Sequence, residues 1–185
     1  IEKKMLSSLR CFIVKTDVDL SGVGISADGD YDEVEMSKVL DIEARNHSAV
    51  QLYQQAFSGE KAITFCINIK HASNVAEAFN KDGVTAAVIH GGMSNEEQQE
   101  LKDKFRSGEI TVLCNADLLI VGFDDDEASV CLNLRPTRSL VMAGQRGGRV
   151  TRLDPNRPGK FAIVVDWVDK NQQRPQILYS HIAGG

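Results

Sequence analysis

The chain has 185 residues, of which 42% are hydrophobic and 25% are charged, and its formal net charge is -5. These proportions are those of a globular protein, so they exclude disordered, collagen-like and low-complexity classes, and the length fits one domain with a full core. No apolar run reaches the roughly 18 residues that a membrane-spanning helix needs, so we expect no membrane partner. The chain begins at Ile1 with neither an initiator Met nor a signal-peptide pattern, so we expect a piece of a longer protein.

The first 44 residues give the weakest local signals. A strand is expected near residues 11–14 and a loop over residues 22–32. The acidic segment 28–35 lacks the Gly and Glu that an EF-hand calcium loop needs at its sixth and twelfth positions, so it predicts a solvated turn. Apolar residues three and four apart then predict a helix over about residues 45–58, which Gly59 ends.

From residue 61 onward, strands and helices alternate. Strands are expected at residues 62–67, 84–89, 110–114, 129–134 and 161–165, and helices at residues 71–82, 94–107 and 139–150. The strands are continuous apolar runs, which is typical of a parallel sheet covered by helices on both faces. Ligands bind such folds beyond the carboxyl ends of the strands, so the residues directly after each strand are the candidate site residues.

The four cysteines contain no C-x-x-C pair and no zinc-ligand spacing to a histidine. Three of them, Cys66, Cys114 and Cys131, lie inside apolar runs. We therefore expect no metal site and interpret these residues as buried, reduced thiols of a cytoplasmic protein.

A basic cluster stands out in this acidic chain. Residues 135–160 hold seven basic residues and one acid, which favours a specific anion site over a general coat for nucleic acid. Arg149 and Arg152 are three apart, so on a helix they would project from nearly one face, and Gly147 and Gly148 permit a close approach. Paired guanidinium groups stabilise the charge that develops in phosphoryl transfer. A solvated surface pair is the alternative interpretation.

The segment Gln145–Arg152 resembles motif VI, Q-R-x-G-R-x-x-R, of superfamily 2 helicases. Other segments resemble the same family in order and spacing: residues 64–72 (motif IV), His90–Met93 (an H-G-x-M turn), Gly122–Asp124 (the G-F-D core of motif V) and Arg135–Ser139 (the R-P-T-x-S segment of restriction-type and DNA-repair helicases). The resemblance covers about residues 58–169. It implies the C-terminal RecA-like lobe of a DEAD/DEAH-type helicase, an α/β fold with a parallel sheet.

The resemblance also implies roles for individual residues. Arg149 and Arg152 would act as arginine fingers on ATP, and Gln145 would orient them or the attacking water. Gly122 and Asp124 would contact the nucleotide. The strand-binding face would consist of short polar groups and backbone donors that hold phosphates without reading bases, namely Asn68, Lys70, Gly91, Gly92 and Thr137.

Parts of a complete motor are missing from the sequence. Neither a G-x-x-x-x-G-K-[ST] loop nor a D-E-x-H or D-E-x-D motif occurs. ATP and Mg²⁺ are therefore expected to be held mainly by an N-terminal RecA-like lobe outside this chain, and the chain alone is expected to be inactive. We expect residues 1–57 to connect into the same lobe, residues 58–169 to form its core and residues 170–185 to be a tail.

Two observations leave alternatives open. Family members commonly carry Thr, often with an acid, where this chain has Ile120 and Val121, so a degenerate lobe that only holds nucleic acid or a partner protein is the second hypothesis. An unrelated dinucleotide-binding domain would need a G-x-G-x-x-G fingerprint, which is absent. The R-P-T segment favours DNA over RNA by analogy. His71 is expected to start a helix, and His90 is open between a structural role and a ligand contact.

Overall fold

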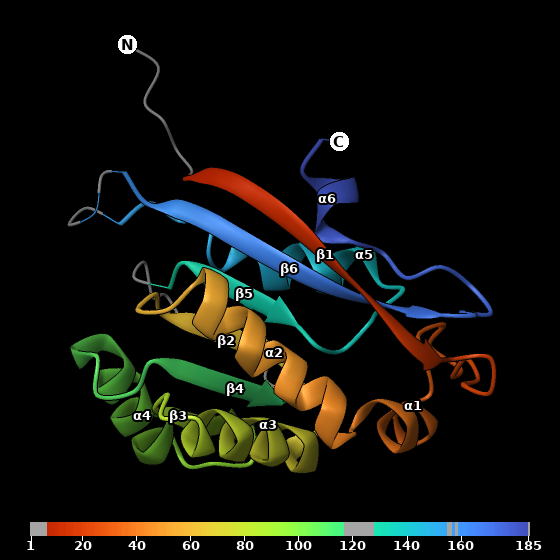
Figure 1. Cartoon of the computed structure of the whole chain (residues 1–185), viewed down its shortest axis with the longest axis horizontal. Helices are drawn as coiled ribbons and strands as arrows, with labels where there is room; N and C mark the ends of the chain where they lie inside the picture. Colours follow the sequence, from red (N-terminus) through yellow and green to blue (C-terminus); the bar gives the residue numbers. More distant parts are fainter. Residues whose placement is uncertain (1–6, 117–127, 155–156, 158, 185) are drawn as a thin grey trace.

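The computed structural model describes residues 7–116, 128–154, 157 and 159–184 (Figure 1). Within them the chain alternates strands and helices in the order β1 (Ser8–Asp19), α1 (Glu33–Leu40), α2 (Glu43–Ala56), β2 (Ala62–Phe65), α3 (Ile69–Lys81), β3 (Ala86–His90), α4 (Asn95–Ser107), β4 (Val112–Ala116), β5 (Val130–Asn133), α5 (Leu140–Gly148), β6 (Phe161–Lys170) and α6 (Tyr179–Ile182).

The strands form one six-stranded sheet in the order β1-β6-β5-β2-β4-β3, and every pair is parallel. The predicted α/β class with a parallel sheet is therefore confirmed. Strand β2 is central: Thr64 lies opposite Cys114 of β4 on one side and Leu132 of β5 on the other. All four residues of β2 are buried, as expected for a strand that is covered on both faces.

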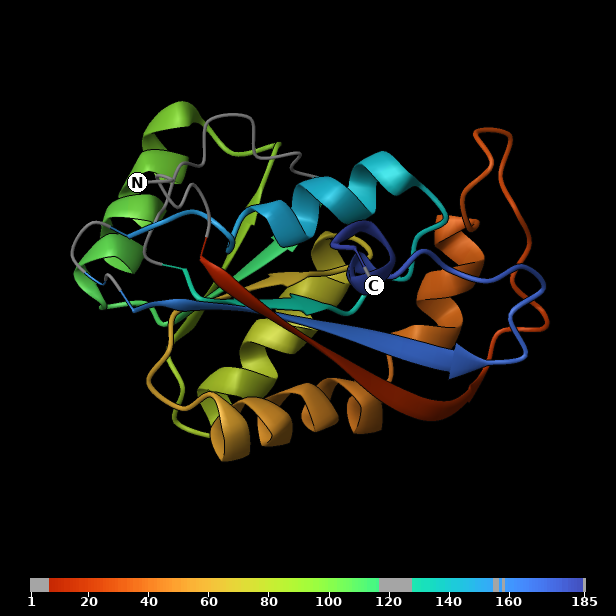
Figure 2. The same cartoon turned by 90° about the horizontal axis from the view of Figure 1, so that it is seen from above.

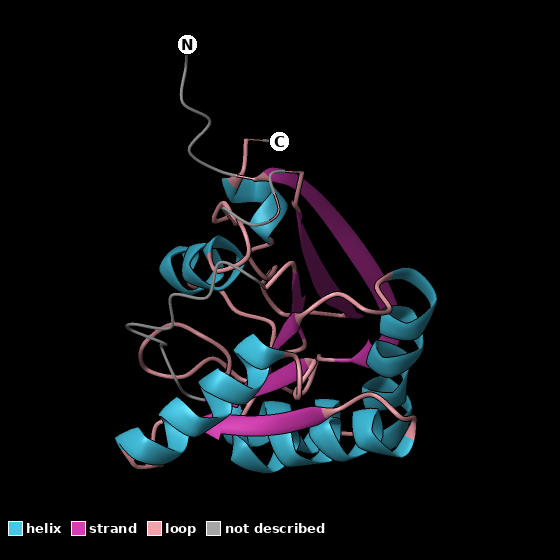
Figure 3. Cartoon of the chain, turned by 90° about the vertical axis from the view of Figure 1, so that its left-hand side faces the viewer, coloured by secondary structure: helices cyan, strands magenta, loops and turns pink. Residues whose placement is uncertain are grey.

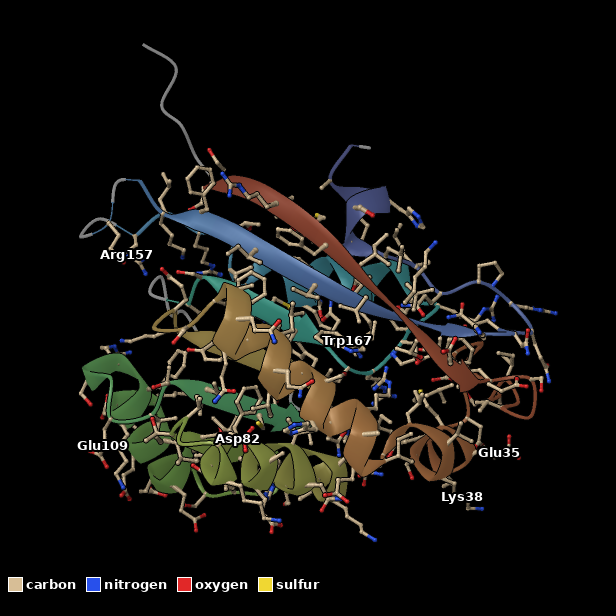
Figure 4. The ribbon with its side chains drawn as sticks, in the orientation of Figure 1. Glu35, Lys38, Asp82, Glu109, Arg157 and Trp167 are labelled. Carbon is tan, nitrogen blue, oxygen red and sulfur yellow. The ribbon has the colours of Figure 1, made fainter. Side chains whose placement is uncertain are left out.

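Helices cover both faces of the sheet (Figures 2 and 3). Helices α2 and α3 lie on one face, where residues such as Val50, Phe79 and the fully buried Trp167 share a core cluster. Helices α4, α5 and α6 lie on the other face, where Phe105 and Tyr179 belong to a second cluster. Trp167 (Figure 4) also donates from Nε1 to Ser48 Oγ of α2 at 3.3 Å, so its polar atom is satisfied inside the core.

Local capping explains why α4 matches its predicted span. Ser94 accepts from the backbone N–H of Glu97, and the Glu97 carboxylate accepts from the Ser94 N–H, which forms a capping box. Gly108 ends the helix with φ 84°, a left-handed conformation that glycine adopts without steric strain.

The N-terminal segment departs most from expectation. The predicted strand is the middle of a 12-residue strand, β1, which pairs with β6 at the edge of the sheet. The prediction of a solvated turn over residues 28–35 holds for Asp28 and Gly29, which are exposed in a turn, but it is wrong from Tyr31 onward, because Tyr31 is 2% exposed and Asp32 caps α1 by accepting from Glu35 N–H. Met36 and Leu40 of α1 are fully buried in a third cluster.

The three cysteines expected in the core are buried and free of disulfides. Among the described residues, every helix is too short or too polar to cross a bilayer.

Candidate functional site

Two of the predicted strand-binding residues begin α3, directly after β2. Asn68 is the N-cap, and its Oδ1 accepts from the His71 N–H at 2.9 Å. Lys70, in the first turn, is exposed. This places a short polar side chain and a solvated cation at the carboxyl edge of the sheet, where α/β folds bind ligands.

Gly91 and Gly92 follow β3 at the same edge, and both are exposed. The Gly92 N–H donates to Nδ1 of His90 at 3.2 Å, so His90 shapes this turn. A Cβ at Gly92 would lie 3.3 Å from that ring nitrogen, which is tighter than an ordinary contact. The open question about His90 is thereby answered in part: it has a structural role in the turn that bears the two glycines.

Thr137 also follows a strand, β5, but its side chain is engaged within the fold. The residue is 3% exposed, and its hydroxyl donates to the Asp30 carboxylate. The Arg138 N–H donates to the other oxygen of Asp30 at 2.7 Å. Residues 26–32 therefore pack against the R-P-T segment. Asp30 and Thr137 are 107 residues apart in the sequence, so no local pattern indicates this contact.

Arg146 is buried beneath this same segment. The residue is 5% exposed, donates from Nη1 to the Arg135 carbonyl at 2.8 Å, and lies 5.6 Å from the ring centroid of Phe65. Burial, together with the positive charge of Arg135, lowers the pKa of Arg146 to about 10, so it stays charged at neutral pH. Sequence reasoning assigned Arg146 no role; its place in motif VI was the available signal.

The two candidate arginine fingers lie at the other edge of the sheet. Helix α5 runs antiparallel to the strands (Figure 2), and Arg149 is its C-cap. Ser7, just before β1, donates from its N–H to the Thr151 carbonyl at 2.8 Å and from Oγ to the Arg152 carbonyl at 2.9 Å. Arg149 and Arg152 are thus beside the amino end of β1, not beyond the carboxyl ends of the strands as expected.

The expectation that both arginines share a helix face is also corrected, because α5 ends at Gly148 and Arg152 follows a turn. Both residues are half-buried, and burial lowers the pKa of Arg149 from its usual value. Gln145 is exposed one turn before Arg149, a spacing at which helical side chains are neighbours. Guanidinium groups suit the oxygens of an anionic polyphosphate.

Gly122 and Asp124, expected at the nucleotide, lie outside the described residues, as do Ile120 and Val121. In the described part of the chain, no group of three or more His, Cys, Asp or Glu side chains is placed to hold a metal ion.

His71 is buried as the third residue of α3, consistent with its expected place at a helix start. Its Nδ1 accepts from the Ile67 N–H at 3.1 Å, so its Nε2 carries the proton and donates to Asn46 Oδ1 at 3.0 Å. Burial lowers the pKa of His71 to about 4, so the ring is neutral at physiological pH.

Comparison with known families identifies the kind of domain. The family model described as "Helicase conserved C-terminal domain" matches residues 44–154, more than half of the chain. The structure is also similar to that of the Escherichia coli DEAD-box protein SrmB in complex with the regulator of ribonuclease activity A, with a TM-score of 0.62 at 17% identity, covering 90% of this chain and 79% of that one. At that identity the likeness shows the fold.

Curated relatives include named helicases. The putative ATP-dependent helicase IRC3 of Saccharomyces cerevisiae is 26% identical over 156 residues, which cover 83% of this chain and 22% of that protein. The ATP-dependent RNA helicase DBP3 of Meyerozyma guilliermondii is 27% identical over 115 residues, which cover 62% of this chain and 22% of that protein. The chain spans about a quarter of the length of the curated relatives it matches.

Proposed function

Because the chain belongs to the helicase conserved C-terminal domain family of superfamily 2, we propose that it is the second motor lobe of an ATP-dependent nucleic-acid helicase or translocase. In this proposal a separate N-terminal RecA-like lobe holds ATP and Mg²⁺. The present chain completes the ATP site and contributes part of the strand-binding face. The chain alone is then inactive, because a phosphate-binding loop is absent from its sequence.

The position of helix α5, whose two ends lie near the two groups of candidate residues, is the observation that carries the proposal. Its N-cap, Ser139, lies next to Thr137 at the carboxyl edge of the sheet, and its C-cap, Arg149, lies near the amino end of β1. A nine-residue helix is about 13 Å long, so one rigid element joins the two groups of candidate residues. Buried Arg146 fixes α5 to the Arg135 carbonyl. This connection supports coupling between strand binding and the ATP site.

At the ATP site, Arg149 and Arg152 would reach the γ-phosphate bound by the other lobe. Their guanidinium groups would stabilise the charge on the transferred phosphoryl group, and release of products would follow as the lobes open. Gln145, one turn before Arg149, would orient that arginine or the attacking water.

At the strand-binding face, Asn68, Lys70, Gly91 and Gly92 lie along one edge of the sheet after β2 and β3. A lobe of net charge -5 gains little affinity from general electrostatics, so the strand would be held jointly by both lobes. The sequence-based preference for DNA has no support, since a relative such as DBP3 is named as an RNA helicase. We therefore propose nucleic acid without a choice between the two.

The second hypothesis, a degenerate lobe that only holds nucleic acid or a protein, rests on Ile120 and Val121 in place of the usual motif V residues. It predicts binding without hydrolysis. A hydrolysis measurement therefore separates the two hypotheses.

The test is nucleic-acid-stimulated ATP hydrolysis by the full-length parent protein and its Arg149→Ala variant, with single-stranded DNA and RNA compared as activators. We expect hydrolysis to fall by about 10³–10⁵, the contribution of an arginine finger, while ATP binding persists. Arg106→Ala is the matched control, because Arg106 is an exposed arginine of α4 that pairs with Asp103. A parent that hydrolyses no ATP, or an Arg149→Ala variant as active as the control, would replace the motor hypothesis with the scaffold hypothesis.

A further inference from the structure

We propose that the segment Arg135–Ser139 contains a binding site for one phosphate of a nucleic-acid strand, and that Asp30 occupies this site as an internal substitute for the phosphate. The proposal rests on the proposed strand-binding function and adds a regulatory contact to it. The segment Ser26–Asp32, here called the acidic loop, would then compete with the strand for the same donors.

The first support is the set of groups that holds the acidic loop. Thr137 Oγ1 donates to Asp30 Oδ2, and the Arg138 N–H donates to Asp30 Oδ1 at 2.7 Å. The Arg138 guanidinium donates from Nη1 to the Gly29 carbonyl. A hydroxyl, a backbone N–H and a guanidinium are the groups that proteins use on phosphate oxygens. Here the hydroxyl and the backbone N–H bind the Asp30 carboxylate, and the guanidinium binds the carbonyl of the preceding residue, Gly29.

The second support is that the hydroxyl of Thr137 is oriented. Its oxygen accepts from the Ser139 N–H at 3.1 Å, so its proton is free to donate outward, and it donates to Asp30. The same orientation would serve a phosphate oxygen in place of the carboxylate. In contrast, the 3% exposure of Thr137 means that no strand can reach this hydroxyl while Asp30 is in place.

The third support is the charge distribution. The acidic segment 28–35 packs against the beginning of the basic region 135–160, and the Arg135 guanidinium lies 3.5 Å from the Glu33 carboxylate. In Figure 4, α1, marked by Glu35 and Lys38, lies at the end of the molecule opposite Arg157, which precedes β6. The acidic loop is therefore at the carboxyl edge of the sheet, where Asn68 and Lys70 begin α3.

Displacement needs only the tip of the acidic loop, residues 26–30, to move, because Tyr31 is buried at its base. Its tip is closed by its own hydrogen bonds, from the Ser26 N–H to the Asp30 carbonyl at 2.8 Å and from the Gly29 N–H to the Ser26 carbonyl at 2.9 Å. Tyr31 anchors its base, donating from the hydroxyl to the Arg174 carbonyl at 2.6 Å. Displacement would break the contacts to Thr137 and Arg138 and leave the core intact. A phosphate of the strand would then take the place of the Asp30 carboxylate.

The test is the affinity of the full-length parent protein for a short fluorescein-labelled oligothymidylate and for the matching oligouridylate, followed by fluorescence anisotropy over a range of salt concentrations. Asp30→Asn removes the competing charge and keeps a side chain of the same shape. We expect this variant to bind about tenfold more tightly than wild type. Its salt dependence should steepen by about 0.7 in log–log slope, the value for one added phosphate contact to a single strand.

Asp28→Asn is the matched control. It removes the same charge from the same loop, but Asp28 accepts hydrogen bonds from Ser26 Oγ and the Asp30 N–H, within the loop. A general loss of repulsion would strengthen both variants equally, whereas competition at the site strengthens Asp30→Asn alone. Adding Thr137→Val to Asp30→Asn should remove the gain, because it removes a donor.

A measurement on wild type guards against misfolding of the variants. Hydrogen–deuterium exchange should become faster over residues 26–30 when the oligonucleotide is added, since the displaced tip loses the support of Thr137 and Arg138 and its own hydrogen bonds open more often. Equal affinities for Asp30→Asn and Asp28→Asn, together with unchanged exchange, would overturn the competition while leaving strand binding intact. No binding by any form at low salt would contradict the proposed strand-binding face, and the competition with it.

Discussion

Gly147 of α5 lies against the aromatic ring of Tyr179 so closely that a Cβ at this position would be 2.2 Å from the ring carbon Cδ2. Tyr179 is held in place by its backbone, because its N–H donates to the Asp166 carboxylate at 3.0 Å. The contact joins α5 to α6 and fixes the helix whose C-cap is Arg149. Gly148, the next residue, has no heavy atom within 4 Å of the corresponding position.

Gly147→Ala is therefore expected to destabilise the fold. Overpacking of a well-packed site costs about 1–3 kcal/mol, and here the neighbour is a rigid ring. Gly148→Ala is the matched control: it meets no neighbour and favours the helix by about 1 kcal/mol, so its stability should equal or exceed that of wild type. Urea unfolding of the two variants measures the difference. Equal stabilities would show that the Tyr179 ring moves aside without loss.

The buried ion pair between Arg45 and Asp169 gives a second prediction. The side chains are 1% and 0% exposed, and two hydrogen bonds of 3.1 and 3.2 Å join the guanidinium to the carboxylate. Arg45 also donates to the Leu134 carbonyl at 2.8 Å. Asp169→Asn leaves the guanidinium buried without a counter-charge, which should reduce the free energy of unfolding by about 3–5 kcal/mol.

Two comparisons make that result interpretable. Glu77→Gln removes the exposed pair between Glu77 and Lys81 and should change stability by at most about 0.5 kcal/mol. The double variant Arg45→Met with Asp169→Leu removes both charges and should lose less stability than Asp169→Asn alone. A loss in Asp169→Asn no greater than in Glu77→Gln would mean that water or a rearrangement compensates the buried charge.

The sequence predicted the sheet well because its strands are apolar runs bounded by glycines and caps. The pattern fails in β6, which extends from the predicted end at residue 165 to Lys170. Asp166 and Asp169 interrupt the apolar run there, yet both carboxylates are buried and satisfied by distant partners. A local window cannot reveal such partners, so a charged residue in a strand looks like its end.

The candidate site was predicted less completely than the sheet, because it also depends on contacts between residues that are far apart in the sequence. Motif VI located the arginines, but their edge of the sheet depends on the direction of α5, which spacing alone does not give. Asp32 and Glu35 do carry a capping signal for α1, and Met36 and Leu40 fall on one helix face; the acidic composition of the segment obscured it. The contact of Asp30 with Thr137 requires tertiary structure.

His71 gives a prediction about pH. Its neutral ring accepts from the Ile67 N–H and donates to Asn46, whose amide orientation is fixed by donation from Nδ2 to the Asp41 carboxylate at 2.9 Å. Protonation would place a proton on Nδ1 against the Ile67 N–H. Burial lowers the pKa of His71 to about 4, the nearby Asp41 carboxylate opposes this shift, and the Arg45 guanidinium adds to it.

The sign follows from proton uptake. As the pH falls below about 6.5, the unfolded chain binds a proton at His71 and the native chain does not, so stability decreases until the pH reaches about 4. Between about pH 7 and about pH 5 this group alone should reduce the free energy of unfolding by about 2 kcal/mol. Urea unfolding at the two pH values measures the loss.

Carboxylates titrate in the same range, so the informative quantity is the difference between variants. His71→Gln should be less stable than wild type at neutral pH but should lose about 2 kcal/mol less on acidification, since it has no ring to protonate. His47→Gln is the control, because His47 is 48% exposed on α2 and lies 3.7 Å from Asp82. This variant keeps the buried His71 ring, so it should lose more stability on acidification than His71→Gln. If His71→Gln lost as much stability as His47→Gln, the acid sensitivity would belong to other groups.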